Sequence, residues 1–365
     1  MMNQVDEILA QCTNILPSYR HRHQTLKQIF QELADALPED EYPDMYGSGD
    51  SLARFEGELA ELMGTEAAVF MPSGTMAQQI ALRIWCERNN NFTVAMHPTA
   101  HPEFAEHLGY QYLHNIRRIQ FGGPEFLRNR ILTVKDFEQL GQKPGVILLE
   151  LPYRELGGEL PTWDELSAVH EWAKVRNIPF HMDGARLWQC RPFYQKSYQE
   201  IAALFDSVYL SFYKDLGGLC GSALLGSADF IKEARVWLRR HGGNLKTQGP
   251  FWASARLGLN RVVPQIDQWV EKARETAELL SQFDDIIIRP NPPHVNFFRL
   301  YIKGDAEALT ERHLEVAKET GTFLFYGLQP ASIPGFATTE MRFDENALSF
   351  DLSQLRPFVE KLLRE

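Results

Sequence analysis

Residues 207–218 read SVYLSFYKDLGG, an apolar run that ends in one lysine and a glycine pair. A short apolar run bounded by turn residues predicts a buried strand, so Lys214 stands just past the carboxyl end of that strand. Lysine is seldom fully buried unless it is paired or used chemically. The apolar approach predicts a lowered pKa and a neutral amine that can attack an aldehyde, whereas a solvated turn lysine is the ordinary alternative.

Other short apolar runs alternate with helical patterns through the middle of the chain. The expected strands are residues 67–70, 146–151, 178–182, 207–212 and 222–225, and the expected helices are residues 75–88, 163–176 and 228–240. An amphipathic helix is also expected from Ser51, as its N-cap, to a stop at Gly64. This alternation predicts an α/β fold with a mostly parallel central sheet flanked by helices.

Three segments are expected along the chain: an N-terminal arm over residues 1–45, a large domain over residues 46–249, and residues 250–365. The arm is polar, mixed in charge and interrupted by prolines. The last segment is expected to hold a long linking helix over about 250–283, followed by a smaller C-terminal α+β domain. Strand-like IIIRP and VNFFRLYI, a helix at 306–320 and a terminal strand and helix make up that domain.

Composition excludes several function classes. A length of 365 residues with 44% hydrophobic residues indicates a large soluble globular chain, and a net charge of -11 argues against nucleic acid or a membrane surface as the main partner. Neither a signal peptide nor a membrane span is indicated. The cysteines, Cys12, Cys86, Cys190 and Cys220, lack C-x-x-C spacing, so reduced thiols in a cytoplasmic protein are the default expectation.

The segment MPSGTMAQQIAL follows an expected strand and opens an expected helix. Ser73, Gly74 and Thr75 would therefore lie at a helix N-terminus, where backbone N–H groups and two hydroxyls can bind a phosphate. An ordinary turn with a serine N-cap is the alternative.

The segment IPFHMDGARLW ends an apolar strand at Asp183, a position where a carboxylate is costly unless it is paired. Asp183 could hold a protonated ring nitrogen, or it could cap a turn or pair with Arg186. Lys214 comes 31 residues later, so both side chains can occupy neighbouring strand ends. A phosphate-binding turn, an acid for a ring nitrogen and an imine-forming lysine are together the contacts that pyridoxal 5'-phosphate (PLP) demands.

Histidines cluster in AMHPTAHPEFAEH, where His97 and His101 are four residues apart. Pro98 and Pro102 argue against one continuous helix and therefore against a zinc site, so no metal is expected. A histidine in such a loop could stack on a flat cofactor, and a solvated loop histidine is the alternative.

The sequence resembles the threonine aldolase and beta-eliminating lyase family of fold-type-I PLP enzymes, in the aspartate aminotransferase superfamily. The match runs in register from about Tyr46 to Gly249, and PSGTM, DGAR and the lysine–glycine segment carry it in that order. It also includes AH at 100–101, GGELP at 157–161 and HGGNLKTQG at 241–249. The resemblance implies Lys214 as the imine lysine, Asp183 on the pyridine nitrogen, and the turn at residues 73–75 on the phosphate.

Further residues are assigned by the same resemblance. His101 matches the family's ring-stacking histidine, and Arg186 matches the arginine near the cofactor's 3′ oxygen and the substrate carboxylate. Arg342 corresponds to a small-domain arginine that binds the carboxylate. Lys246 stands where the family usually has arginine, which keeps the charge and loses the bidentate fork.

Three stretches depart from the family pattern. Where members typically read Glu-Asn-Thr-His-Asn, this chain reads ELPYR at 150–154, so a histidine thought to help hold a β-hydroxyl is absent and Tyr153 or Arg154 takes its neighbourhood. Tyr213 and Asp215 flank the lysine where common members carry serine and glycine. The family's Arg-Ser-Asp stretch near the amino terminus is also unrecognisable.

The resemblance implies a PLP-dependent lyase that cleaves the Cα–Cβ bond of a β-hydroxy-α-amino acid to glycine and an aldehyde, with His101 orienting the hydroxyl. Reactions that begin at Cα–H, namely β-elimination, racemisation or transamination, are the alternative, and a non-catalytic PLP-binding protein is a third reading. The expected partner is a small-molecule amino acid, and a homodimer or homotetramer is implied by the family.

Overall fold

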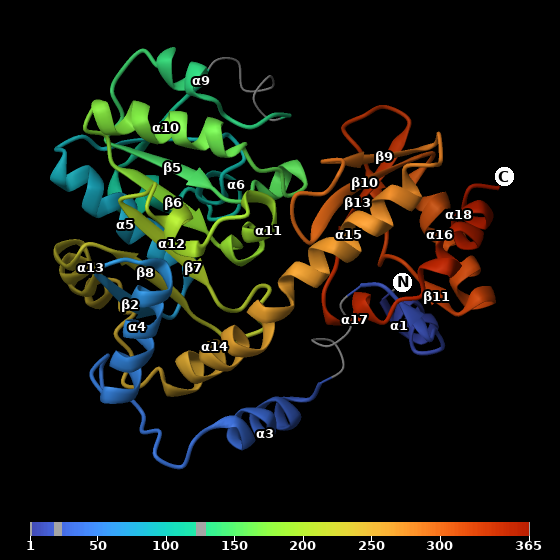
Figure 1. Ribbon diagram of the computed structural model, residues 1–365, viewed down its shortest axis with the longest axis horizontal. Helices are drawn as coiled ribbons and strands as arrows, with labels where there is room; N and C mark the ends of the chain where they lie inside the picture. The colour runs from blue at the N-terminus through green and yellow to red at the C-terminus, as the bar shows by residue number, and fades with distance from the viewer. Residues whose placement is uncertain (1, 18–23, 122–128, 365) are drawn as a thin grey trace. The chain divides into compact units, whose positions relative to one another are not determined.

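The computed structural model describes residues 2–17, 24–121 and 129–364 (Figure 1). Contacts divide the chain into two compact units. The larger unit consists of Leu26–Glu155 and Leu160–Pro264, and the smaller unit consists of Leu156–Glu159, Gln265–Glu365 and the first 25 residues. The arm expected over residues 1–45 is therefore divided between the two units.

The boundary expected after residue 249 coincides with the start of α14 (Gly249–Val262). This helix packs against α3 (Leu26–Ala36) and α4 (Asp50–Met63), so it belongs to the larger unit. The boundary between the units falls after Pro264 instead.

The long helix expected over about residues 250–283 is two helices. A 3₁₀ turn, η3 (Val263–Gln265), separates α14 from α15 (Ile266–Leu280). Pro264 lies in this turn, and its missing N–H and its ring do not fit a helix interior.

The larger unit is built on a seven-stranded sheet in the order β2-β8-β7-β6-β5-β3-β4, in which β8 is antiparallel to both neighbours and the other pairs are parallel. Its strands are β2 (Ala67–Met71), β3 (Thr93–Met96), β4 (Arg117–Ile119), β5 (Val146–Glu150), β6 (Phe180–Gly184), β7 (Ser207–Ser211) and β8 (Ser222–Gly226). The mostly parallel sheet is confirmed, with every expected strand present. The additional strands β3 and β4 are short, with four and three residues, which gives them little periodic signal.

Helices surround this sheet, and the three expected ones are confirmed as α5 (Gly74–Arg88), α10 (Trp163–Val175) and α13 (Ala228–Arg240). Helix α4 ends at Gly64 in the left-handed conformation, as expected, but its N-cap is Gly49 and Ser51 is buried within its first turn. The remaining helical segments are short: α6 (His101–Phe104), α7 (Gly109–His114), α9 (Val134–Glu138), η1 (Arg154–Leu156), η2 (Leu187–Gln189), α11 (Arg191–Tyr194) and α12 (Tyr198–Ala202).

Alternating side chains of β2 show how the two faces are covered. Val69 and Met71 pack in one apolar cluster with residues of α5 and α13. Phe70 points to the opposite face, where its ring centroid lies 6.1 Å from Phe55 of α4 and 6.0 Å from Phe212. The aromatic cluster of Phe55, Phe70 and Phe212 thus supports the chain directly before Lys214.

The smaller unit contains a four-stranded antiparallel sheet in the order β12-β13-β10-β9. Its strands are β9 (Ile286–Arg289), β10 (Phe297–Lys303), β12 (Gln329–Pro330) and β13 (Phe336–Arg342), and its helical segments besides α15 are α1 (Met2–Leu9), α16 (Ala306–Thr320), α17 (Glu345–Leu348), η4 (Leu352–Gln354) and α18 (Leu355–Leu362). The expected strands and helices of the C-terminal segment are confirmed. The N-terminal β1 (Asn14–Ile15) pairs in parallel with β11 (Thr322–Phe323), which the sequence pattern does not predict.

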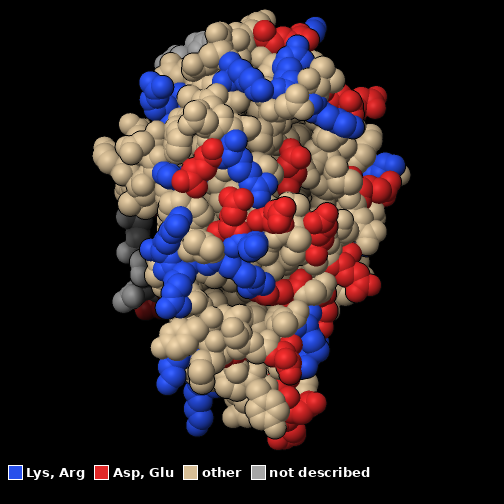
Figure 2. Space-filling view, turned by 90° about the vertical axis from the view of Figure 1, so that its left-hand side faces the viewer, with Lys and Arg blue, Asp and Glu red and all other residues tan. Residues whose placement is uncertain are grey.

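Charged side chains of both signs intermingle on the face shown in Figure 2. Two of the ion pairs formed by α13 join Arg88 to Glu233 at 2.8 Å and Arg235 to Glu56 at 2.5 Å. Across the described ranges, no helix is long and apolar enough to cross a membrane.

Phe55→Ala tests whether the aromatic cluster stabilises the larger unit. The ring is completely buried, so its removal leaves a cavity and should lower the free energy of unfolding by about 3–5 kcal/mol in urea denaturation. Tyr112→Ala, at a side chain that is 78% exposed in α7, should change it by less than about 0.5 kcal/mol. Equal effects of the two substitutions would contradict this assignment.

Candidate active site

The carboxyl ends of β5, β6 and β7 bring the central predicted residues together at one edge of the sheet. Glu150 is the register partner of Asp183, and Asp183 is the register partner of Tyr209. Lys214 follows three residues after the end of β7. Because carboxyl ends of neighbouring parallel strands meet at the same edge, the predicted meeting of Asp183 and Lys214 follows from this topology.

Asp183 and Lys214 interact electrostatically in a dry setting. Asp183 is 1% exposed, and its Oδ1 accepts a hydrogen bond from the Ala185 backbone N–H at 3.1 Å. Burial raises the pKa of Asp183, while the Lys214 charge opposes this rise. Burial lowers the pKa of Lys214 against the opposing attraction of Asp183, which favours the neutral, nucleophilic amine as predicted.

Glu150 adds a second carboxylate beside Asp183. Its Oε1 accepts a hydrogen bond from the Arg154 backbone N–H at 3.2 Å. Burial, together with the charge of Asp183, raises the pKa of Glu150 to about 7. The sequence offered a signal for this residue, since Glu150, like Asp183, is a carboxylate that ends an apolar strand.

The turn at residues 73–75 lies at the N-terminus of the 15-residue helix α5, as predicted. Ser73 is the N-cap in extended conformation, and its side chain makes no capping hydrogen bond, so its hydroxyl is not used to cap the helix. A Cβ added to Gly74 would lie 2.0 Å from the Tyr209 hydroxyl oxygen, so only glycine permits this approach of helix to strand. Gly74 and Thr75 begin a helix whose first N–H groups can bind an anion.

A buried hydrogen-bond chain fixes β6, β7 and α5 relative to one another beneath this edge. Trp85 Nε1–H donates to Ser207 Oγ at 2.7 Å, and Ser207 Oγ lies 2.8 Å from His181 Nδ1. His181 Nε2 lies 2.9 Å from Gln78 Oε1, which can only accept, so Nε2 carries the proton. Burial lowers the pKa of His181 to about 3, which keeps the ring neutral. The strand that carries Asp183 is thereby held against the helix that begins at Gly74.

His101 lies at the start of α6, and its Nδ1 is 2.9 Å from Glu106 Oε1. This hydrogen bond raises the pKa of His101, against burial and the Lys214 charge, and Asp183 adds a smaller favourable effect. Because Lys214 and Asp183 both affect the pKa of His101, the imidazole lies near these predicted site residues. Sequence reasoning missed Glu106, because α6 ends at Phe104 and no periodicity links the two residues.

His97 has a different environment from His101. Its Nδ1 lies 2.7 Å from Thr99 Oγ1, and its Nε2 lies 3.0 Å from the Arg130 carbonyl oxygen. Both ring nitrogens therefore contact protein groups, which indicates a structural role. Tyr153 is 1% exposed, with its ring centroid 5.2 Å from that of His97 in an edge contact.

Arg186 follows β6 and is 8% exposed. Its Nε lies 3.8 Å from Asp215 Oδ2, and its charge lowers the pKa of both Lys214 and Glu150. Arg186 therefore lies near Lys214, Glu150 and Asp215, and its contacts with a cofactor and a substrate stay predictions.

The other predicted substrate residues are placed individually. Arg154 lies in η1 and pairs with Glu155 at 3.4 Å. Arg342 is the last residue of β13 in the smaller unit, where it is the register partner of Phe297. Their roles toward a substrate stay predictions.

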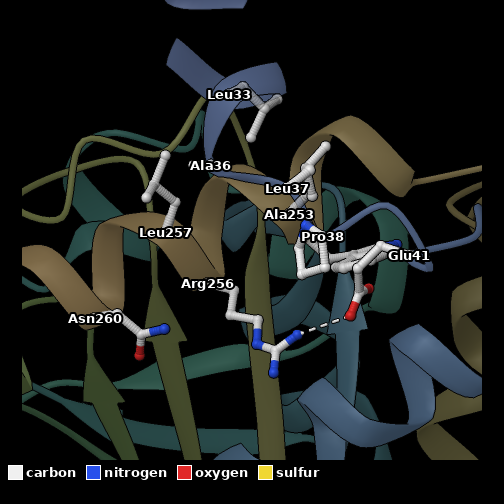
Figure 3. Close-up of a pocket in the computed structure, with 10 residues that line it drawn as sticks. Leu33, Ala36, Leu37, Pro38, Glu41, Ala253, Arg256, Leu257 and Asn260 are labelled. Carbon is white, nitrogen blue, oxygen red and sulfur yellow. Dashed lines mark hydrogen bonds and ion pairs between the residues drawn. The ribbon is translucent and has the colours of Figure 1, made fainter.

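A cavity of about 260 Å³ lies elsewhere in the larger unit, between α3 and α14 (Figure 3). Leu33, Leu37 and Trp252 contribute apolar lining, and Arg256 donates a hydrogen bond to Glu41 at 3.1 Å. Its lining includes no predicted site residue, so this cavity is distinct from the candidate site.

The fold and this cluster define an enzyme of the fold-type-I PLP class. The chain belongs to the beta-eliminating lyase family, whose sequence model matches residues 24–303. A solved structure named as a candidate L-allo-threonine aldolase, from Listeria monocytogenes, is 34% identical and superimposes with a TM-score of 0.91 over 99% of this chain and 98% of that one.

Two curated relatives bear on the reaction. Low-specificity L-threonine aldolase 1 of Arabidopsis thaliana is 25% identical over 296 residues, which cover 78% of this chain and 81% of the relative. An alanine racemase of Cochliobolus carbonum is 27% identical over 226 residues, which cover 59% of this chain and 56% of the relative.

Glu106→Gln tests the His101–Glu106 contact. Loss of the carboxylate charge should move the pKa of His101 downward, as measured by NMR titration of histidine-labelled protein. At pH values below the ordinary histidine pKa, the His101–Glu106 contact stabilises the folded chain. This contribution is lost as the pH rises through the pKa that His101 has in the folded protein. Glu171→Gln is the matched control, since it removes an exposed carboxylate 3.6 Å from His170 and should leave the His101 titration unchanged. An unchanged His101 titration in Glu106→Gln would refute the assignment.

Proposed function

We propose that this protein is a PLP-dependent lyase that cleaves the Cα–Cβ bond of a β-hydroxy-α-amino acid, releasing glycine and an aldehyde. The observation that carries the proposal is the meeting of Lys214, Asp183 and the N-terminus of α5 at one edge of the sheet. Relatives named as threonine aldolases support the choice of reaction.

The residues present fit PLP. Lys214 would bind it covalently through its amine, Asp183 would hold the proton on the ring nitrogen, and the turn at residues 73–75 would bind the phosphate. His101 would contact the ring, and Arg186 would lie near its 3′ oxygen. The start of α5 supports this fit, because the Ser73 side chain makes no capping hydrogen bond there and can contact a phosphate. Bound PLP supplies an electron sink for a bond broken at Cα.

The chain's own groups position the substrate and move the protons. Because Glu106 engages Nδ1 of His101, Nε2 is the ring nitrogen that can contact the β-hydroxyl, directly or through water. The hydroxyl loses its proton as the Cα–Cβ bond breaks, which releases the aldehyde, and Cα then gains a proton to give glycine. Arg186 supplies a positive charge for the substrate carboxylate.

A reaction that begins at Cα–H is the second candidate. The family's hydroxyl-holding histidine is replaced within ELPYR at 150–154, and one relative is named an alanine racemase. Racemisation, β-elimination or transamination would use Lys214 as the proton carrier.

We also propose that the protein forms a homodimer or homotetramer in the cytoplasm. Size-exclusion chromatography with light scattering would test the oligomeric state, and cell fractionation would test the localisation.

Lys214→Ala tests the cofactor assignment. The variant should lose the visible absorbance of the purified enzyme and reduce aldehyde release to background, because no other amine replaces the covalent attachment. Lys196→Ala is the matched control, since it removes an ammonium that pairs with Glu200 at 3.0 Å. A variant at position 214 that keeps both signals would overturn the assignment.

A panel of threonine, allo-threonine and phenylserine tests the reaction. The expected result is glycine and the matching aldehyde in equal amounts from at least one of them. Exchange of the Cα hydrogen with solvent deuterium, measured by NMR without aldehyde release, would favour the second candidate. Absence of turnover across the panel would exclude the proposed aldol cleavage.

A further inference from the structure

Asp215 directly follows Lys214 and forms a buried ion pair within the larger unit. Its Oδ2 lies 3.8 Å from Arg186 Nε, and the two side chains are 2% and 10% exposed. Arg186 belongs to the turn after β6, and Asp215 belongs to the segment after β7. The ion pair therefore joins the segments that follow two neighbouring strands, directly beside the predicted cofactor lysine.

Stability alone does not account for this pair. Removing two charges from water costs free energy that their attraction inside the protein often fails to recover. Asp215 nevertheless directly follows Lys214 and pairs with Arg186, so it contacts one cation of the site and adjoins the other in the chain. The position of Asp215 is therefore better explained by its electrostatic effect on Lys214 and Arg186.

Charged and titratable groups on several elements of the larger unit act on Lys214. Asp183 and Glu150, at the ends of β6 and β5, attract its positive charge, and Arg186 repels it. His101 on α6 interacts with Lys214 as well. Asp215 attracts the Lys214 charge and also forms an ion pair with Arg186, so it offsets the repulsion between the two cations.

We propose that Asp215 is a positioning residue that holds the Arg186 guanidinium from its Nε side and balances the guanidinium charge beside Lys214. The role has two separable parts. Asn at position 215 keeps a polar side chain of nearly the same shape beside Arg186 Nε and removes the charge, whereas Ala removes both the side chain and the charge. This inference rests on the proposed function only in taking PLP and an amino acid carboxylate as the ligands.

Charge balance is tested on the full chain freed of PLP. Competitive acylation across neutral to alkaline pH, with mass-spectrometric quantification of the Lys214 peptide, reports the titration midpoint of its amine. In Asp215→Asn and Asp215→Ala the midpoint should move downward by about half a pH unit, because a negative charge that favours the ammonium is lost. Glu233→Gln is the matched control, since it removes the carboxylate that pairs with Arg88 at 2.8 Å, and it should leave the midpoint unchanged. Equal midpoints in wild type and both variants would overturn this part.

Orientation of Arg186 is tested by steady-state kinetics of the holoenzyme. Asp215→Ala should raise KM for the amino acid by about fivefold or more over Asp215→Asn, with a smaller change in kcat, because only Ala leaves the guanidinium unsupported. Equal KM values in the two variants would overturn the positioning role. If the proposed function is wrong, the wild-type protein will show neither visible absorbance nor turnover. Acylation of Lys214 still measures the charge balance in that case, so the two failures can be told apart.

Discussion

The register between β5, β6 and β7 is the constraint on which the site depends. It places Glu150 beside Asp183 and Asp183 beside Tyr209, in three strands whose residues are all buried. A slip of one residue in β6 would turn Asp183 to the opposite face of the sheet, away from α5. The hydrogen bonds that His181 makes to β7 and α5 oppose such a slip. The hydrogen-bonded pairing of the strands therefore determines which charged groups lie together, before any ligand binds.

This arrangement costs stability at neutral pH. Burial raises the pKa of Asp183 and lowers that of Lys214, so the folded chain disfavours the ionised form of each group relative to the unfolded chain. The attraction between Asp183 and Lys214 offsets only part of the free-energy cost of desolvation, because each pKa still shifts in the direction that burial imposes. The aromatic cluster of Phe55, Phe70 and Phe212 lies against the segment that carries the lysine and contributes apolar burial there. A ligand that pairs with these groups would stabilise the folded state further.

Features encoded by local patterns were predictable from the sequence, and features made by distant contacts were not. The expected strands and helices of the sheet follow from apolar periodicity, and the strand-end positions of Asp183 and Lys214 follow from them. Strands β3 and β4 are too short to carry such a pattern. The pairing of β1 with β11 joins segments from opposite ends of the chain, so no local signal marks it. The Arg186–Asp215 pair likewise depends on the lateral order of β6 and β7.

Two departures from the family pattern fall on the segments that follow β5 and β7 rather than on the strands themselves. Tyr153 lies in the segment after β5, and its buried ring packs against His97, whose nitrogens already contact protein groups. The role of Tyr153 toward a substrate hydroxyl stays a prediction. Asp215 lies after β7 and changes the charge beside Lys214 without altering the register that holds Asp183. The paired strands therefore fix Glu150 and Asp183 at the sheet edge, while the segments that follow the strands can vary without disturbing that pairing.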